Sequence, residues 1–159
     1  MTIEVGGQTR RIGLALSGGG FRAAAFHLGV FRKLHDAGLL WKLDLLSCVS
    51  GGSIAGAFLA SHWEEDDALE KLERYLANTS IAVSSVIGGM LDPFHTRLDK
   101  LAASYERDLY GKRSLGSLKG GPRLYVNATN LATGNMFFFV TGGNLPAEMG
   151  EWQLGAAPA

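Results

Sequence analysis

The sequence contains a single cysteine among its 159 residues, Cys48, and this scarcity excludes two kinds of covalent support. One cysteine cannot form a disulfide within the chain, and it cannot supply the cysteine cluster of a structural zinc site. The chain is nevertheless long enough to bury a hydrophobic core of its own. We therefore expect one folded unit over residues 1–159, with no metal and no cofactor.

Net charge and long apolar runs are also lacking. Fifteen Lys and Arg balance fifteen Asp and Glu, so the charge favours neither nucleic acid nor a strongly anionic membrane as a partner. No stretch approaches the roughly 18 apolar residues of a membrane span. The first apolar run, residues 12–16, is too short for a secretory signal. A cytoplasmic location is the default expectation, although export by a signal-independent route would leave the same sequence.

Glycine, in contrast, is abundant and clustered. Glycine accounts for 22 of the 159 residues, which is roughly twice its average share of about 7%. Many stand in adjacent groups, which indicates tight turns and close backbone approach at defined places.

Short apolar runs alternate with amphipathic segments along the chain, which predicts an α/β layered fold with a mainly parallel sheet. The expected strands are residues 12–17, 43–49, 123–130 and 136–140, and the expected helices are residues 21–37, 53–62, 64–77 and 96–110. Residues 81–91 are apolar and leave two interpretations open, a lipid-facing lid or a core segment. Residues 112–123 form a basic loop, either solvated or in contact with anionic head groups.

The first predicted strand ends in a triple-glycine turn, Gly18, Gly19 and Gly20. A helix that begins there leaves backbone N–H groups without partners and adds positive potential, so the turn predicts an anion site. One candidate anion is a dinucleotide pyrophosphate, because Gly18-x-Gly20-x-x-Ala23 fits the loose form of the dinucleotide fingerprint. That site also needs an acidic residue at the end of the second strand, where this sequence has Val49-Ser50-Gly51.

The end of the second strand indicates a different chemistry. Cys48-Val-Ser50-Gly-Gly52 has the form of a nucleophile elbow, G-x-S-x-G, with cysteine in place of the first glycine. In an elbow the serine stands above the sheet, and the next N–H, here that of Gly51, points at the oxyanion. The two glycine turns together predict one acyl-transfer site. Two alternatives remain: Ser50 as a helix N-cap, and Ser53 as the nucleophile.

Segments carrying these turns resemble those of a known family. Leu-Ser-Gly-Gly-Gly-Phe-Arg-Ala-Ala at residues 16–24 resembles the G-G-G-x-[RK] oxyanion motif of patatin-like phospholipases and of the related cytosolic phospholipases A. Ser-Cys-Val-Ser-Gly-Gly-Ser-Ile at residues 47–54 resembles their nucleophile segment, and residues 126–134 are similar to a later strand and turn. The resemblance covers roughly residues 12–140, the N-terminal portion of that domain.

The resemblance implies a three-layer α/β/α sandwich that hydrolyses fatty-acyl esters of phospholipids or related lipids with a Ser–Asp dyad. It makes Ser50 the nucleophile and Gly18, Gly19 and Gly20 the oxyanion hole, joined by Gly51. Arg22 would support the glycine loop or attract an anionic head group; a solvated helix cation is the other interpretation. The implied partner is a lipid substrate, reached by transient contact with a membrane surface, and the oligomeric state is left open.

The chain departs from the family pattern at the dyad aspartate. The family places it in a D-G-G or D-G-A motif downstream, and no Asp-Gly pair occurs in this sequence. We therefore expect a domain truncated at the C-terminus, with little ester turnover, because an unactivated serine is a weak nucleophile. The four histidines, His27, His35, His62 and His95, have no obvious carboxylate partner, and structural or surface roles are predicted for them. A non-catalytic nucleotide- or lipid-binding module, with the Gly18–Gly20 loop as anion cradle, is the alternative function.

Overall fold

The computed structural model describes residues 3–63, 65–88, 102–118, 120–143 and 147–152. A five-stranded sheet has the order β3 (Ile12–Leu16), β4 (Leu43–Val49), β5 (Arg123–Thr129), β6 (Met136–Thr141) and β7 (Glu148–Trp152). The β3–β4 and β4–β5 pairs are parallel, and the two remaining pairs are antiparallel. Four of the five strands therefore run in one direction, and the predicted α/β class with a mainly parallel sheet is confirmed.

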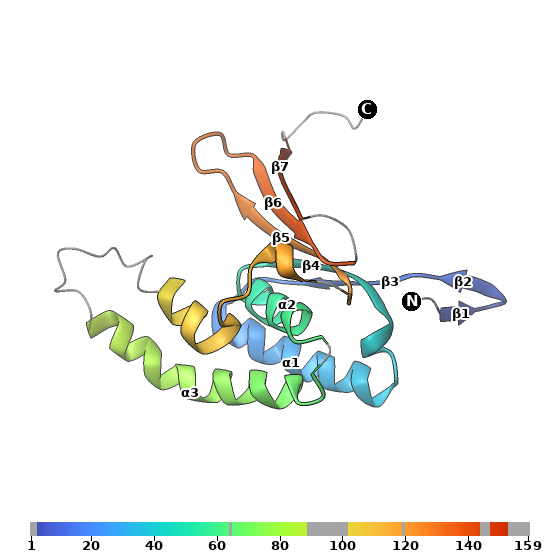
Figure 1. Ribbon diagram of the computed structural model, residues 1–159, viewed down its shortest axis with the longest axis horizontal. Helices are drawn as coiled ribbons and strands as arrows, with labels where there is room; N and C mark the ends of the chain where they lie inside the picture. Colours follow the sequence, from blue (N-terminus) through green and yellow to red (C-terminus); the bar gives the residue numbers. More distant parts are fainter. Residues whose placement is uncertain (1–2, 64, 89–101, 119, 144–146, 153–159) are drawn as a thin grey trace.

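Helices α1 (Gly20–Asp36), α2 (Gly51–Ser61) and α3 (Ala68–Gly88) lie together on one side of strands β3 and β4 (Figure 1). Because β3, β4 and β5 are parallel neighbours in chain order, each connection crosses over in the same sense and lands on the same face. Helix α2 contacts all three of these strands and also packs against α1. These contacts fix α2, including the residues at its N-terminal end, against the sheet.

The small residues of α2 allow it to lie close to the sheet. A β-carbon on Gly56 would collide with the sulfur of Cys48 on β4 and would stand 2.9 Å from Leu16 Cδ1. Cys48, Ala55 and Leu59 are fully buried at this contact. The core between helix and sheet continues through Leu46 and Phe31.

Helix α1 begins and ends within one residue of its predicted limits. Gly38 has a φ of 66°, and its N–H donates to the His35 carbonyl at 2.8 Å. That left-handed conformation is the one in which glycine commonly ends a helix. Buried residues Ala24, Leu28 and Phe31 lie on one face of the helix, as expected from their spacing.

Helix α3 differs from its prediction at both ends. It begins at Ala68 and runs to Gly88, so it takes up residues 81–88 of the apolar segment; residues 89–91 lie outside the described part. Ahead of the helix, Glu65 and Asp67 both bind the Lys71 ammonium, at 2.7 and 2.8 Å. These ion pairs fix the acidic residues in the preceding turn instead of in the helix.

Two predicted features near residue 100 are only partly visible. The expected helix over residues 96–110 is described from residue 102: residues 102–105 are helical, and a single π-helical turn, η2 (Glu106–Tyr110), follows them. Gly111, with a φ of 61°, ends it. Residues 96–101 and His95 lie outside the described residues.

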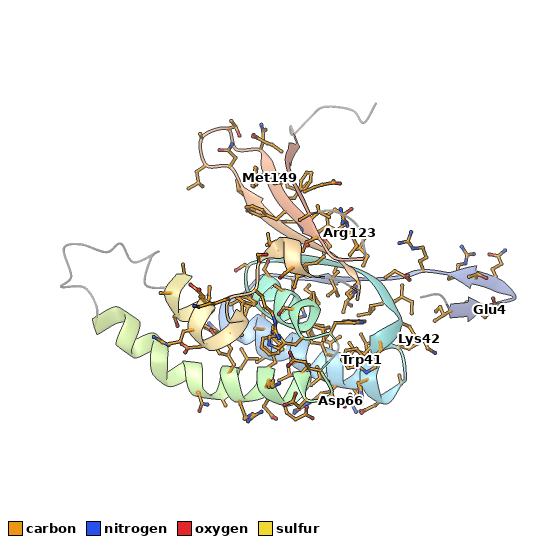
Figure 2. The ribbon with its side chains drawn as sticks, in the orientation of Figure 1. Glu4, Trp41, Lys42, Asp66, Arg123 and Met149 are labelled. Atoms are coloured by element: carbon orange, nitrogen blue, oxygen red, sulfur yellow. The ribbon has the colours of Figure 1, made fainter. Side chains whose placement is uncertain are left out.

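Short exposed strands were not predicted. β1 (Ile3–Val5) and β2 (Gln8–Arg10) form a separate hairpin that projects from the body of the molecule (Figure 1). Strand β7 was also missed. The Arg123 guanidinium at the start of β5 (Figure 2) lies 3.8 Å from the carboxylate of Glu148, the first residue of β7. The same guanidinium donates to the Gly142 carbonyl at 3.1 Å. Among the described residues, no helix has the length and apolarity needed to span a bilayer.

We expect Gly56→Ala to lower the free energy of unfolding by about 1–3 kcal/mol, because the added methyl group overpacks the helix–sheet contact. Gly29→Ala is the matched control: Gly29 is in helix α1 with open space around it, so alanine should stabilise by about 0.5–1 kcal/mol. Urea unfolding measures both. Equal effects of the two substitutions would contradict the close contact, and Cys48→Ala should recover part of the Gly56→Ala loss.

Candidate active site

The two predicted glycine turns lie side by side at one edge of the sheet. Leu16 at the end of β3 pairs with Cys48 near the end of β4. Each strand leads directly into a helix, α1 after Gly19 and α2 after Ser50. Two helix N-termini, each with backbone N–H groups that lack intrahelical partners, therefore meet at the carboxyl edge of parallel strands. Open α/β sheets bind their ligands at this edge.

Ser50 has a backbone conformation that serine rarely adopts. Its φ is 51° and its ψ is −120°, and it is the one described non-glycine residue with positive φ. Strain of this kind costs of order 1–3 kcal/mol and is concentrated at functional sites. The side chain is exposed, and its hydroxyl makes no capping hydrogen bond to α2. The N-cap interpretation is therefore not supported, and the geometry is that of a strand–turn–helix elbow.

The backbones of the two turns nearly touch, and glycine is required where they do. A β-carbon on Gly51 would collide with the carbonyl of Gly20, and one on Gly52 would collide with the carbonyl of Leu16. On the opposite turn, a β-carbon on Gly18 would stand 3.2 Å from Ser50 Cβ and 3.8 Å from its Oγ. The Ser50 side chain and the triple-glycine turn are therefore close neighbours, with little more room between them than a β-carbon on Gly18 would fill.

Cys48, at the first position of the elbow motif, is an inert part of the core. It is fully buried, and burial raises the pKa of its thiol to about 12. The thiol therefore stays protonated at neutral pH, and a protonated thiol is a poor nucleophile. Of the two nucleophilic side chains in the motif, Ser50 is the exposed one.

A cavity of about 530 Å³ lies beside Ser50. Its walls come from the start of α1, from α2, from residues 105–118 and from strands β5 and β6. The lining surface is mostly apolar, and the apolar side chains in it are those of Phe21, Ile54, Ala57, Leu115, Leu118, Val126 and Phe139. Its size and lining are those of a pocket for a small, largely apolar ligand.

The sequence predicted the part of this cavity at the glycine turns, where Gly20, Ser50 and Gly51 line it, and no other part. Val126 and Phe139 are on predicted strands and face each other in the antiparallel register of β5 and β6. No local sequence pattern predicts that Tyr105, Tyr110 and Leu115 lie in the same cavity as Ser50. Burial raises the pKa of both tyrosines, so their hydroxyls remain protonated.

Arg113 also lines the cavity, and its guanidinium is bonded to His62 and Glu65. One guanidinium nitrogen donates to Nε2 of His62 at 2.6 Å, and the other donates to the Glu65 carboxylate at 2.6 Å. The His62 ring bonds the Phe58 carbonyl through Nδ1, and burial lowers the pKa of His62, with the Arg113 charge acting in the same direction. This network fixes the loop that carries Arg113 against the end of α2.

The other predicted polar residues lie outside the cavity. His27 is buried on α1, where its Nε2–H donates to the Ser17 carbonyl at 3.0 Å, directly before the triple-glycine turn. His35 is exposed. Arg22 is exposed on the first turn of α1, and no hydrogen bond or ion pair of its side chain occurs among the described residues. Its role stays a prediction.

Strain at Ser50 has a measurable consequence. We expect Ser50→Gly to have a free energy of unfolding about 1–2 kcal/mol higher than Ser50→Ala, because only glycine adopts this backbone conformation without cost. Both variants lack the hydroxyl, so the comparison isolates the backbone. Thermal or urea unfolding of the two proteins provides the measurement, and equal stabilities would show that the turn is unstrained.

Comparison with models of known protein families gives a match to the patatin-like phospholipases over residues 14–134, well over half of the chain. The matched range contains both glycine turns, helices α1 to α3 and the β5 strand. None of the curated proteins and none of the solved structures compared matches the chain. The family match, together with the α/β fold, shows that this chain belongs to the patatin-like phospholipase family.

Proposed function

We propose that the protein is a serine acyl hydrolase that cleaves fatty-acyl esters of phospholipids or related lipids, with Ser50 as the nucleophile. The observation that carries the proposal is the contact between an exposed, strained serine and a triple-glycine turn at an apolar cavity. Family membership supports the reaction class. In this assignment the acyl chain occupies the cavity and the ester carbonyl lies at its Ser50 end.

In the first step the Ser50 hydroxyl oxygen adds to the ester carbonyl carbon and loses its proton to a base, and the carbonyl oxygen becomes an oxyanion. We assign the backbone N–H groups of Gly18, Gly19, Gly20 and Gly51 to that oxyanion. One such donor is worth about 10²–10³ in rate. Collapse expels the alcohol, which takes up a proton, and water then hydrolyses the acyl-serine to release the fatty acid.

None of the described residues that line the cavity is an aspartate, a glutamate or a histidine. The family dyad uses an aspartate in an Asp-Gly motif, a pair that this sequence lacks. We therefore propose that acylation by these residues alone is slow, since Ser50 lacks its activating base.

The cavity favours an acyl chain over a nucleotide. Its lining is mostly apolar, and β4 ends without the carboxylate that a dinucleotide ribose requires. For Arg22, exposed on the first turn of α1 beside the glycine turn, we propose attraction of an anionic head group.

Labelling with an alkyl fluorophosphonate over a long incubation tests the nucleophile, because such probes react rapidly with an activated serine and only slowly with one that lacks its base. We expect modification of the wild-type chain to map to Ser50 by peptide mass spectrometry. Ser50→Ala should abolish labelling, and Ser53→Ala should retain it. Labelling that survives Ser50→Ala and disappears in Ser53→Ala would transfer the assignment to Ser53.

The bond from His27 to the Ser17 carbonyl should position the glycine turn. We expect His27→Ala to slow labelling of Ser50 about tenfold, because the lost bond frees the strand end that leads into Gly18. His27→Gln, whose amide can donate to the same carbonyl, should restore much of the rate. His35→Ala, on the exposed face of the same helix, is the control. Labelling of His27→Ala at the wild-type rate would contradict a positioning role.

A further inference from the structure

The cavity beside Ser50 extends along the whole of helix α2. Ser50, directly before the helix, lines it, and so does Ser61, the last residue of the helix. Ile54 and Ala57 line it between them, at the spacing of residues that share one face of a helix. The 11 residues of α2 rise about 16 Å, so an extended chain can lie in the cavity along the helix.

At the Ser61 end the cavity adjoins a second cavity of about 290 Å³. Ser61, Arg113 and Leu118 line both cavities, so these side chains separate them. Arg113 is fixed in this position by its bonds to His62 and Glu65. Both of these partners line the second cavity and not the first. The Arg113 side chain therefore lies between the two cavities, at the end of the first that is remote from Ser50.

We propose that Arg113 is a specificity-determining residue, which limits the acyl chain to about 12–14 carbons. This inference rests on the proposed function, because that function places the ester carbonyl at Ser50 and the chain in the cavity. An extended chain of single bonds advances about 1.2 Å per bond, so about 13 bonds cover the length of α2. A longer chain meets a hydrogen-bonded guanidinium, and displacing that group breaks its bonds to His62 and Glu65.

Two substitutions change the length of the cavity in opposite directions. Arg113→Ala joins the two cavities and lengthens the space. In that variant Glu65 keeps its ion pair with Lys71 at 2.7 Å, so its carboxylate is not left unpaired. Apolar surface for the end of a longer chain comes from Ala60, Trp63 and Leu118. Ala57→Leu has the opposite effect, because the larger side chain fills the cavity partway along α2.

Equilibrium binding of octanoate, dodecanoate and hexadecanoate, which are products of the proposed reaction, tests the inference by isothermal titration calorimetry. In the wild-type chain the affinity should rise about two- to fourfold per carbon up to dodecanoate, and hexadecanoate should bind no more tightly. Arg113→Ala should bind hexadecanoate about tenfold more tightly than wild type does. Arg107→Ala is the matched control, because Arg107 is exposed, pairs with its neighbour Asp108 and should leave the length profile unchanged.

Ala57→Leu is the second variant, and its outcome does not depend on the stability of Arg113→Ala. It should weaken binding of dodecanoate about tenfold and leave binding of octanoate nearly unchanged. Affinity that keeps rising to hexadecanoate in the wild-type chain would overturn the inference. An unchanged length profile in Arg113→Ala or in Ala57→Leu, or no binding of any of the acids, would also overturn it.

Binding of the acids does not need Ser50 to react, so the inference and the proposed function fail separately. A length limit that is present when fluorophosphonate labelling is absent after long incubation would refute the hydrolase and leave the role of Arg113. Labelling of Ser50 in a chain that shows no length limit would refute the role of Arg113 alone.

Discussion

The close approach of two backbone turns governs the rest of this structure. Where β3 and β4 end as parallel neighbours, the chain must start two helices within the spacing of adjacent strands, about 4.8 Å. Gly51 lies against the carbonyl of Gly20, and Gly52 lies against the carbonyl of Leu16, with no space for a β-carbon at either position. Because the turns meet in this way, the N-termini of α1 and α2 lie side by side at one edge of the sheet.

That approach determines what Ser50 can do. With the following residues held against the neighbouring turn, the serine takes the strained positive-φ conformation and its hydroxyl stays free of the helix that it precedes. Burial of apolar side chains beneath the turn offsets the strain energy of Ser50: Cys48, Leu46 and Leu59 are fully buried between sheet and helix. A fold of ordinary stability, about 5–15 kcal/mol, can carry one such strained residue when the surrounding packing fixes it.

The cavity depends on contacts between distant parts of the chain. Residues 105–118 form one wall, and Arg113 fixes that wall by its bonds to His62 and Glu65, which stand at and just after the end of α2.

The sequence by itself determined the elements with strong local signals. Strands β3, β4, β5 and β6 and helix α1 were predicted to within one residue at each end, because short apolar runs and turn glycines mark their limits. The pairing of the triple-glycine turn with the Ser50 elbow was also predicted, since both follow strands that were expected to be parallel neighbours.

Tertiary structure alone decided the remaining features. The start of α3 at Ala68 depends on ion pairs from Lys71 to Glu65 and Asp67, and β7 forms only because β6 offers an open edge. The far wall of the cavity, with Tyr105 and Leu115, is assembled from segments whose local pattern does not indicate that they lie beside Ser50. Contacts between distant segments are properties of the packed molecule, so the position of Arg113 between two cavities is visible only after folding places it there.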